Sequence, residues 1–334
     1  MNPFDYTLAP SVDAAVAALG APLGAAGRSP KVLAGGTTLV DLMRLNVEQP
    51  AAIVDINRIP GLSQIDTGQP DELVFGALAR MSDVADDPVV RRDYPVLSES
   101  LWRAASQQLS NMASLGGNLL QRTRCAYFRD RQYPCNKREP GTGCSALGGL
   151  NRGHAVLGVS DQCIAVYPGD LAIALVALDA SIDVRGASGA RTLKVADLHH
   201  EPGQTPDRET TLAPDELILR IHVPKSRLGK ASTYLKIRDR ESYAFAIASA
   251  AVALDMDGDV VRDARIAVGG LATRPWRVQA AEQSLVGKPF TDAAAAHAGR
   301  LALQGAVTRP QNAFRVELGA NTVAQALKTA RERA

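Results

Sequence analysis

The chain has 334 residues, of which 46% are hydrophobic and 22% are charged, and its 37 basic and 35 acidic side chains give a net charge of +2. The two signs of charge are mixed along the chain, without the clustered basic excess that binding to a nucleic-acid backbone requires. The longest apolar stretch, residues 244–254, is far shorter than the roughly 20 residues that cross a bilayer. We therefore expect a soluble protein of two or three domains that has no membrane span and binds no nucleic acid.

The amino-terminal sequence, MNPFDYTLAP, lacks the basic and apolar regions of a signal peptide. We expect the chain to fold in the cytoplasm without a signal of its own. Export together with a partner that carries a signal stays compatible with the sequence.

Apolar spacing and turn residues predict the following elements, in chain order. Up to residue 109 they are a helix at 12–19, a strand at 31–33, a helix at 39–45, strands at 51–57 and 72–78, and one helix at 96–109. Beyond residue 163 they are a helix at 170–178, a hairpin of strands at 180–185 and 190–195, strands at 216–223, 232–238 and 246–254, a strand at 264–268 after an Asp257-Gly258 turn, and helices at 276–286, 291–304 and 322–330. A composition shift at 224–230 predicts a domain boundary.

Residues 122–163 differ from the rest, because Arg, Pro, Gly and Cys dominate and no periodicity remains. A run this long without regular structure suggests that something other than packing organises it. All four cysteines of the chain fall inside it, in polar surroundings that offer no burial reason for a thiol: Cys125, Cys135, Cys144 and Cys163. We expect the neighbouring basic residues to lower the thiol pKa values: Arg122, Arg124, Arg129, Arg131, Lys137 and Arg138.

Three chemistries compete for these cysteines. Cytoplasmic folding disfavours disulfides. Structural zinc sites usually contain close Cys-x2–4-Cys pairs, whereas nine, eight and eighteen residues separate the cysteines here. A four-iron cluster takes four thiolates and tolerates wide spacings, so the pattern favours it over zinc, and either metal site over disulfides.

Two Gly-rich loops carry the second signal. Ala34-Gly35-Gly36-Thr37-Thr38 follows a predicted strand and opens a helix, and Ser114-Leu115-Gly116-Gly117-Asn118 repeats that chemistry farther along. Backbone N–H groups at a helix start bind phosphate, and glycine allows close approach. Neither loop has the pattern of a Walker A or Rossmann motif, so two loops together indicate a long ligand with two phosphates.

Single residues are less informative. Asp170 suits either a sugar hydroxyl of a ligand or the N-cap of the helix that it precedes. Lys236 suits either a ligand contact or an ordinary edge strand. The five histidines form no spaced metal set, and we interpret them as surface or loop residues: His154, His199, His200, His222 and His297.

These motifs resemble the FAD-binding subunits of the xanthine dehydrogenase and carbon monoxide dehydrogenase group. KVLAGGTTL and SLGGNLL look like that family's two pyrophosphate loops, and GDLAIALVALDA resembles its Ser-Asp-Leu helix start, with Gly169 in place of the serine. PDELILRIHVP, YLKIRDR and GGLATRPWR resemble its later strands and the opening of its C-terminal domain. The resemblance extends over about residues 2–330.

The resemblance implies an α+β protein with a two-subdomain FAD-binding fold of the vanillyl-alcohol-oxidase (PCMH-like) type, followed by a small α+β C-terminal domain. The implied FAD-binding domain is 1–226, with subdomains at about 1–57 and 58–226 and a cysteine-bearing insertion at 122–163, and the C-terminal flavoprotein domain is 227–334. The implied FAD contacts are Lys31, Val32, Leu33, Ala34, Gly35, Gly36, Thr37, Thr38 and Leu39 in the first loop, Ala113, Ser114, Gly116, Gly117, Asn118 and Leu120 in the second, and Asp170, Ile218 and Lys236 beyond them. No catalytic side chain is expected, because the cofactor carries the chemistry.

The insertion departs from most of the family. It is similar to the FAD subunit of exported bacterial aldehyde oxidoreductases, and the alternative is the FAD subunit of hydroxybenzoyl-CoA reductases. In both branches it resembles a [4Fe-4S] site, here with Cys125, Cys135, Cys144 and Cys163 as ligands. The resemblance implies a molybdenum-cofactor catalytic subunit and a subunit with two [2Fe-2S] clusters as partners, an external electron acceptor and a periplasmic location by co-export. A zinc-stabilised scaffold protein without redox chemistry is the hypothesis from another class.

Overall fold

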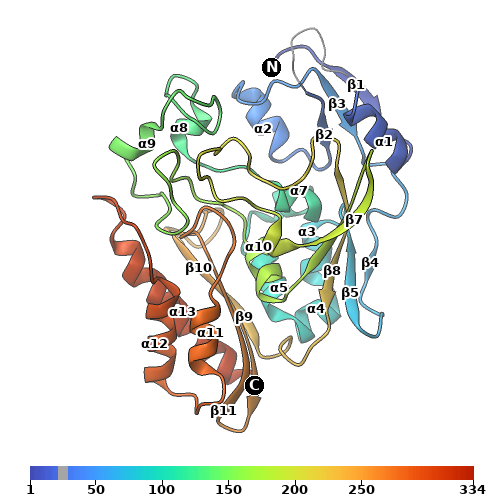
Figure 1. The fold of residues 1–334 in the computed structure, drawn as a ribbon. Coiled ribbons are helices and arrows are strands. Elements are labelled where there is room, and N and C mark those ends of the chain that lie inside the picture. Colours follow the sequence, from blue (N-terminus) through green and yellow to red (C-terminus); the bar gives the residue numbers. More distant parts are fainter. Residues whose placement is uncertain (22–28) are drawn as a thin grey trace.

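The computed structural model describes residues 1–21 and 29–334 and contains three separate β-sheets (Figure 1). The amino-terminal part holds a parallel sheet of order β1-β3-β2 with two helices. Its elements are β1 (Asp5–Leu8), α1 (Val12–Leu19), β2 (Lys31–Leu33), α2 (Leu39–Arg44) and β3 (Ala52–Asp55). Ser11 starts α1, because its side chain accepts a hydrogen bond from the Ala14 amide.

The second part is built on an antiparallel sheet of order β4-β5-β8-β6-β7. Its strands are β4 (Ile65–Asp66), β5 (Glu72–Gly76), β6 (Ser181–Gly186), β7 (Gly189–Lys194) and β8 (Leu217–Pro224). Its helices are α3 (Met81–Asp86), α4 (Pro88–Asp93), α5 (Pro95–Trp102), α6 (Gln107–Ser110), α7 (Leu115–Leu119), α10 (Leu171–Ala177) and the 3-10 turn Val195–Asp197. Every residue of α10 is buried, so this helix forms the centre of the main core.

The cysteine-bearing segment adds only two single-turn helices, α8 (Ala126–Arg129) and α9 (Ser145–Gly148), between long loops. It lies on one side of the molecule, beside α2 and above the C-terminal helices as drawn in Figure 1. The prediction that periodic structure is largely missing here is confirmed.

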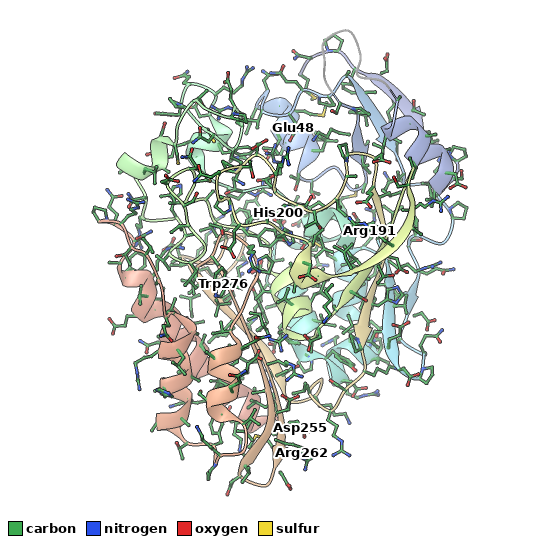
Figure 2. The ribbon with its side chains drawn as sticks, viewed as in Figure 1. Glu48, Arg191, His200, Asp255, Arg262 and Trp276 are labelled. Carbon is green, nitrogen blue, oxygen red and sulfur yellow. The ribbon has the colours of Figure 1, made fainter. Side chains whose placement is uncertain are left out.

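The carboxyl-terminal part is an antiparallel sheet of order β12-β11-β10-β9 with three helices on one face. Its elements are β9 (Ser232–Ile237), β10 (Ala248–Asp257), β11 (Val260–Gly269), β12 (Trp276–Arg277), α11 (Gln279–Leu285), α12 (Asp292–Ala302) and α13 (Phe314–Glu332). The side chains of Asp255 and Arg262, 3.6 Å apart, mark the far end of the β10–β11 hairpin in Figure 2.

Strand β10 is buried on both faces, which explains its continuous apolar sequence. Successive side chains of a strand point to opposite faces. Ala250 and Val252 therefore join the core under the C-terminal helices, while Ala251 and Ala253 join the core around α10. The two parts of the chain thus pack on opposite sides of one sheet.

Several predicted elements were wrong in their limits. The helix at 96–109 is two helices, because Ser106 accepts a hydrogen bond from the Leu109 amide and starts α6 anew. Trp276 and Arg277 pair with β11 as a strand, and the helix begins only at Gln279. The last helix begins at Phe314, earlier than predicted. A glycine inside it, which packs against Leu271 and Leu303, interrupts the apolar pattern on which the prediction relied.

The α+β class is confirmed. Among the residues that the structure describes, no helix is both long and apolar enough to cross a membrane.

Candidate functional site

The first Gly-rich loop leaves β2 and enters α2 through Gly36, whose φ of 73° lies in the left-handed region that favours glycine. Within residues 1–21 and 29–334, the backbone amides of residues 35–38 donate no hydrogen bond to a protein acceptor. Four successive free N–H groups at the start of a helix form an anion-binding concavity. The loop therefore fits a phosphate group.

The two Gly-rich loops touch each other. A side chain on Gly35 would overlap the carbonyl oxygen of Met112, immediately before the second loop. The Arg80 guanidinium donates a hydrogen bond to the same oxygen. Glycine at position 35 is thus required for the close approach of two segments that lie far apart in the sequence.

The second loop differs from the first in what its amides do. Leu115 N donates to Ala79 O at 3.0 Å, Gly116 N donates to Ala77 O at 2.9 Å, and Gly117 N donates to Ser114 Oγ at 3.3 Å. These amides hold the loop on the sheet and are not free for phosphate. Its unsatisfied group is the Asn118 side-chain oxygen, which is buried without a partner among the described residues.

Asp170 and Lys236, both predicted to contact the cofactor, contact each other. Lys236 Nζ donates to Asp170 Oδ2 at 2.9 Å, and Tyr234 Oη donates to Asp170 Oδ1 at 2.6 Å. Asp170 occupies the N-cap position of α10, but within the described residues its side chain caps no helix amide. Burial raises the pKa of Asp170, while the neighbouring Lys236 ammonium opposes that rise.

The remaining predicted contacts occupy different environments. Ile218 on β8 is buried in the core around α10. Leu120, just beyond α7, is 39% exposed. Residues 32–39 of the first loop are half-buried, and an open hollow of about 500 Å³ adjoins Gly36 and Thr37. The first loop and its surface are therefore open to a ligand, whereas Asp170, Ile218 and Lys236 lie inside the protein.

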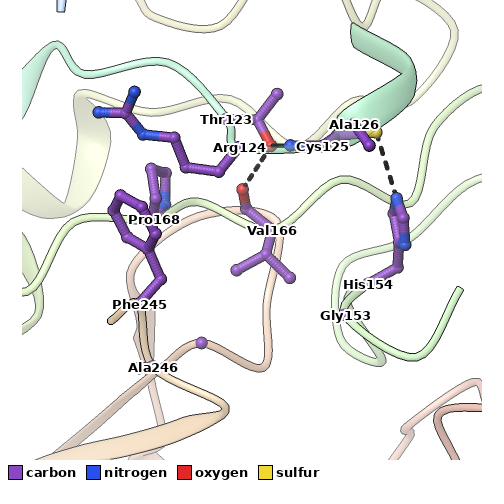
Figure 3. Close-up of a pocket in the computed structure, with 11 residues that line it drawn as sticks. Thr123, Arg124, Cys125, Ala126, Gly153, His154, Val166, Pro168, Phe245 and Ala246 are labelled. Atoms are coloured by element: carbon purple, nitrogen blue, oxygen red, sulfur yellow. Dashed lines mark hydrogen bonds between the residues drawn. The ribbon is translucent and has the colours of Figure 1, made fainter. Parts of the chain in front are cut away.

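A second cavity, of about 270 Å³, lies where the cysteine segment meets the C-terminal domain (Figure 3). Arg124, Cys125 and His154 line it from the segment, and Phe245 lines it from the β9–β10 loop. The Arg124 guanidinium stands 5.0 Å from the centre of the Phe245 ring. Cys125 Sγ is 3.2 Å from His154 Nε2, as the dashed line in Figure 3 marks.

The structure describes all four cysteines as free thiols, so none is held in a disulfide. Cys135 and Cys144 face each other in an antiparallel bridge. Burial raises the pKa of Cys125 to about 12, and the thiols of Cys135 and Cys163 add to that rise. Burial likewise raises the pKa of Cys163 to about 11, with Cys144 and Cys135 adding to it. The thiols of Cys125 and Cys163 each therefore have two other thiols of the set in their surroundings.

Two expectations about these cysteines were wrong. Cys135 and Cys163 are buried, although their sequence neighbours are polar. The pKa values of Cys125 and Cys163 are raised, because burial outweighs the nearby basic residues.

Carboxylates from outside the segment neutralise most of its basic side chains. Arg122 contacts Glu48 at 2.5 Å and Glu209 at 2.6 Å, and Lys137 contacts Glu209 at 2.8 Å. Asp41 on α2 takes two further ion pairs, at 3.3 Å from Arg124 and 2.7 Å from Arg129. These pairs fix the cysteine segment to α2 and to the loop that carries Glu209; Figure 2 labels Glu48 beside α2.

In the described part of the chain, no three or more His, Cys, Asp or Glu side chains gather closely enough to hold a single metal ion. A single zinc ion needs all its ligands about 2.0–2.3 Å away. A four-iron cluster differs, because each thiolate binds a different iron and the sulfurs stand farther apart. Four free cysteine thiols equal the number of ligands that such a cluster takes.

The interpretation of the histidines as surface or loop residues was wrong for one of them, and two of the loop histidines have buried side chains. His154 and His199 are buried, and His222 lies in β8 between Glu72 and Asp183. Burial lowers the pKa of His154 and of His199 to about 4. Sequence reasoning missed His154, since only the fold brings it to Cys125.

Comparison with known proteins adds to this geometry. Residues 2–226 match the model of the FAD binding domain in molybdopterin dehydrogenase, and residues 233–330 match the CO dehydrogenase flavoprotein C-terminal domain. The chain belongs to the FAD-binding subunits of the xanthine and carbon monoxide dehydrogenase family. This family membership confirms the two-subdomain FAD-binding fold with its smaller C-terminal domain and makes the chain a subunit of an oxidoreductase.

Individual relatives agree with this family membership. The chain is 45% identical over 305 residues to the aldehyde oxidoreductase FAD-binding subunit PaoB of Escherichia coli, covering 91% of this chain and 92% of that one. It is 27% identical to the carbon monoxide dehydrogenase medium chain of Hydrogenophaga pseudoflava, covering 86% and 82%. The solved carbon monoxide dehydrogenase of that organism has a TM-score of 0.77 and 27% identity, with 100% of both chains covered.

Proposed function

We propose that the chain is the FAD-binding, electron-transfer subunit of a molybdenum-dependent aldehyde oxidoreductase. The observation that carries this proposal is the row of free amides at residues 35–38, in a chain that belongs to an FAD-binding family. The 45% identity to an aldehyde oxidoreductase subunit supports aldehyde as the substrate class. FAD, when bound, supplies the exchange of electrons between protein partners and an external acceptor.

The residues of this chain bind and orient the cofactor. The amides of residues 35–38 would hold the pyrophosphate, with the helix start of α2 adding positive potential. Asn118 would complete the site with its unsatisfied side-chain oxygen, which needs a hydrogen-bond donor. No acid or base on this chain is required, because substrate chemistry belongs to a molybdenum subunit and electrons arrive through a subunit with two [2Fe-2S] clusters.

We also propose a [4Fe-4S] cluster on Cys125, Cys135, Cys144 and Cys163. The free state of the thiols, the facing pair Cys135 and Cys144, and the mutual effect of the thiols on one another support it. A cluster would link these long loops to one another, in addition to the ion pairs that attach the segment to α2 and the Glu209 loop.

Anaerobic reduction of the bound FAD in the purified complex tests the substrate class. Simple aldehydes are expected to bleach the flavin, and carbon monoxide is expected to leave it oxidised. Bleaching by carbon monoxide and not by aldehydes would contradict the proposal and place the chain with the carbon monoxide dehydrogenases.

Iron and acid-labile sulfide assays test the cluster. Cys135→Ser is expected to lose iron and sulfide while the FAD content stays unchanged. Tyr133→Phe, a change in the same loop that removes no thiol, serves as the control. Zinc in place of iron in the unaltered chain would contradict the proposed cluster. Such a chain would also lack the visible absorption of an iron–sulfur cluster, because zinc contributes none.

A further inference from the structure

The imidazole of His154 contacts one of the four cysteines of the proposed cluster site. His154 Nε2 is 3.2 Å from Cys125 Sγ, across the wall of the cavity in Figure 3. Cys125 stands at the start of α8, whereas His154 belongs to the loop after α9. The contact therefore joins two separate stretches of the segment.

The C-terminal domain helps to hold His154 in place. Asn312 Nδ2 donates to the His154 carbonyl oxygen at 3.3 Å, and the His154 amide donates to Asn151 O at 3.0 Å. The imidazole is buried and stacks in a tilted arrangement 6.2 Å from the ring of Tyr127. A side chain fixed from several directions keeps its Nε2 aimed at the sulfur.

The surroundings of the ring decide where its proton sits. Nδ1 is buried and has no hydrogen-bond partner among the described residues. A proton on Nδ1 would leave a buried N–H group without an acceptor, which is the costlier arrangement. A neutral imidazole carries one N–H, so the proton belongs on Nε2, facing Cys125 Sγ.

We propose that His154 donates an N–H···S hydrogen bond to Cys125 and raises the reduction potential of the cluster. This inference rests on the proposed cluster. A metal-bound thiolate has no proton to give and can only accept. A donor to a ligating sulfur stabilises the reduced form, which carries one more negative charge. His154 therefore acts as a positioning and tuning residue and not as a ligand.

Redox titration of the purified complex, monitored by EPR, tests the proposal. His154→Leu removes the donor, His154→Gln keeps an N–H at a similar distance, and His297→Leu changes an exposed histidine on α12. We expect all three to retain iron. In the H154L complex, the ratio of oxidised to reduced cluster at a given potential should rise on the order of tenfold, equivalent to a reduction potential about 59 mV lower. The reduction potentials of the other two variants should match that of the unaltered complex. An unchanged potential in H154L with full iron would overturn the proposal.

A second measurement covers the case in which H154L fails to fold or loses iron. Pulsed EPR of the unaltered complex, labelled with ¹⁵N-histidine, should show one weakly coupled histidine nitrogen. A strong coupling would make His154 an iron ligand, and no coupling would remove the hydrogen bond; either result overturns the inference. An unaltered complex without iron and sulfide overturns the cluster itself, and that failure is visible before any variant is made.

Discussion

Lys236 on β9 and Asp170 at the start of α10 form an ion pair of 2.9 Å, with side chains that are 0% and 4% exposed. The register between β9 and β10 explains why the side chain of Lys236 reaches Asp170. Lys236 pairs with Ser249 of β10, so its side chain points to the face of the sheet that packs on α10. Tyr234, two residues earlier on the same face, donates to Asp170 and accepts from Ser249 Oγ, 2.8 Å away. A buried charge pair thus joins the flavin-binding part to the C-terminal sheet.

Removal of one partner from this pair should be costly. Lys236→Met leaves the Asp170 carboxylate buried and without its cation, which is expected to lower the free energy of unfolding by about 3–5 kcal/mol. Urea unfolding measures the change. Lys328→Met, which breaks an exposed pair with Asp292, should cost about 0–1 kcal/mol. Equal effects of the two changes would mean that the buried pair contributes nothing special.

Gly35→Ala should abolish FAD binding. A methyl group there overlaps the Met112 carbonyl oxygen, so the two Gly-rich loops must move apart and the row of free amides is distorted. Flavin content per purified chain is the measurement. Gly68→Ala is the matched control, since a methyl group there meets its nearest neighbour, Asp66 Oδ1, at 3.5 Å. Full flavin in G35A would show that the contact between the loops is not needed for the site.

Arg122→Gln should reduce iron content more than FAD content. The change deprives Glu48 and Glu209 of their shared cation and loosens the attachment of the cysteine segment. Arg191→Gln removes an Arg–Glu pair on β7, labelled on the right-hand side of Figure 2, and should leave iron unchanged. Iron and flavin assays on both variants decide the matter. Equal iron content in the two variants would show that the Arg122 ion pairs are not needed for the cluster to be bound.

His199 should make the fold sensitive to acid. Its pKa is lowered to about 4 by burial, so between pH 6.5 and 4 the unfolded chain binds a proton that the folded chain does not. The free energy of unfolding therefore falls as the pH falls through this window, by on the order of 3 kcal/mol at about 1.4 kcal/mol per pH unit. Well above pH 6.5 the imidazole is neutral in both states and contributes no slope.

His199→Phe tests this sensitivity. Phenylalanine keeps a ring against Tyr167, whose hydroxyl still donates to the Leu119 carbonyl oxygen at 3.0 Å. The variant should show a shallower loss of stability between pH 6.5 and 4 in urea unfolding. His200→Phe, at the exposed neighbouring position, should keep the slope of the unaltered chain. Identical slopes in both variants would assign the acid sensitivity to other groups.

Local sequence pattern was sufficient to predict most elements. The helix at 12–19 and the strand at 31–33 have the predicted limits, because a capping serine and a Gly-rich turn mark them. The last helix was predicted too short, since its first half is polar and contains a glycine whose role is to pack against Leu271. Tertiary contact, which the local pattern does not contain, determines that half.

The residue types of the candidate site could be predicted from the sequence, but their tertiary contacts could not. The cysteine cluster and the Gly-rich loops stand out by residue type alone. The sequence did not reveal that Glu209 and Glu48 neutralise Arg122, that the thiols are buried, or that His154 lies at Cys125. Each of these depends on segments that only the fold brings together.

An anaerobic absorption spectrum of the purified chain, with flavin, iron and sulfide assays, tests the central claim most directly. We predict a flavin spectrum on a broad, reducible iron–sulfur absorption, with one FAD and about four irons per chain. Flavin without iron would keep the FAD subunit and remove the cluster. A chain that binds no flavin would contradict the account.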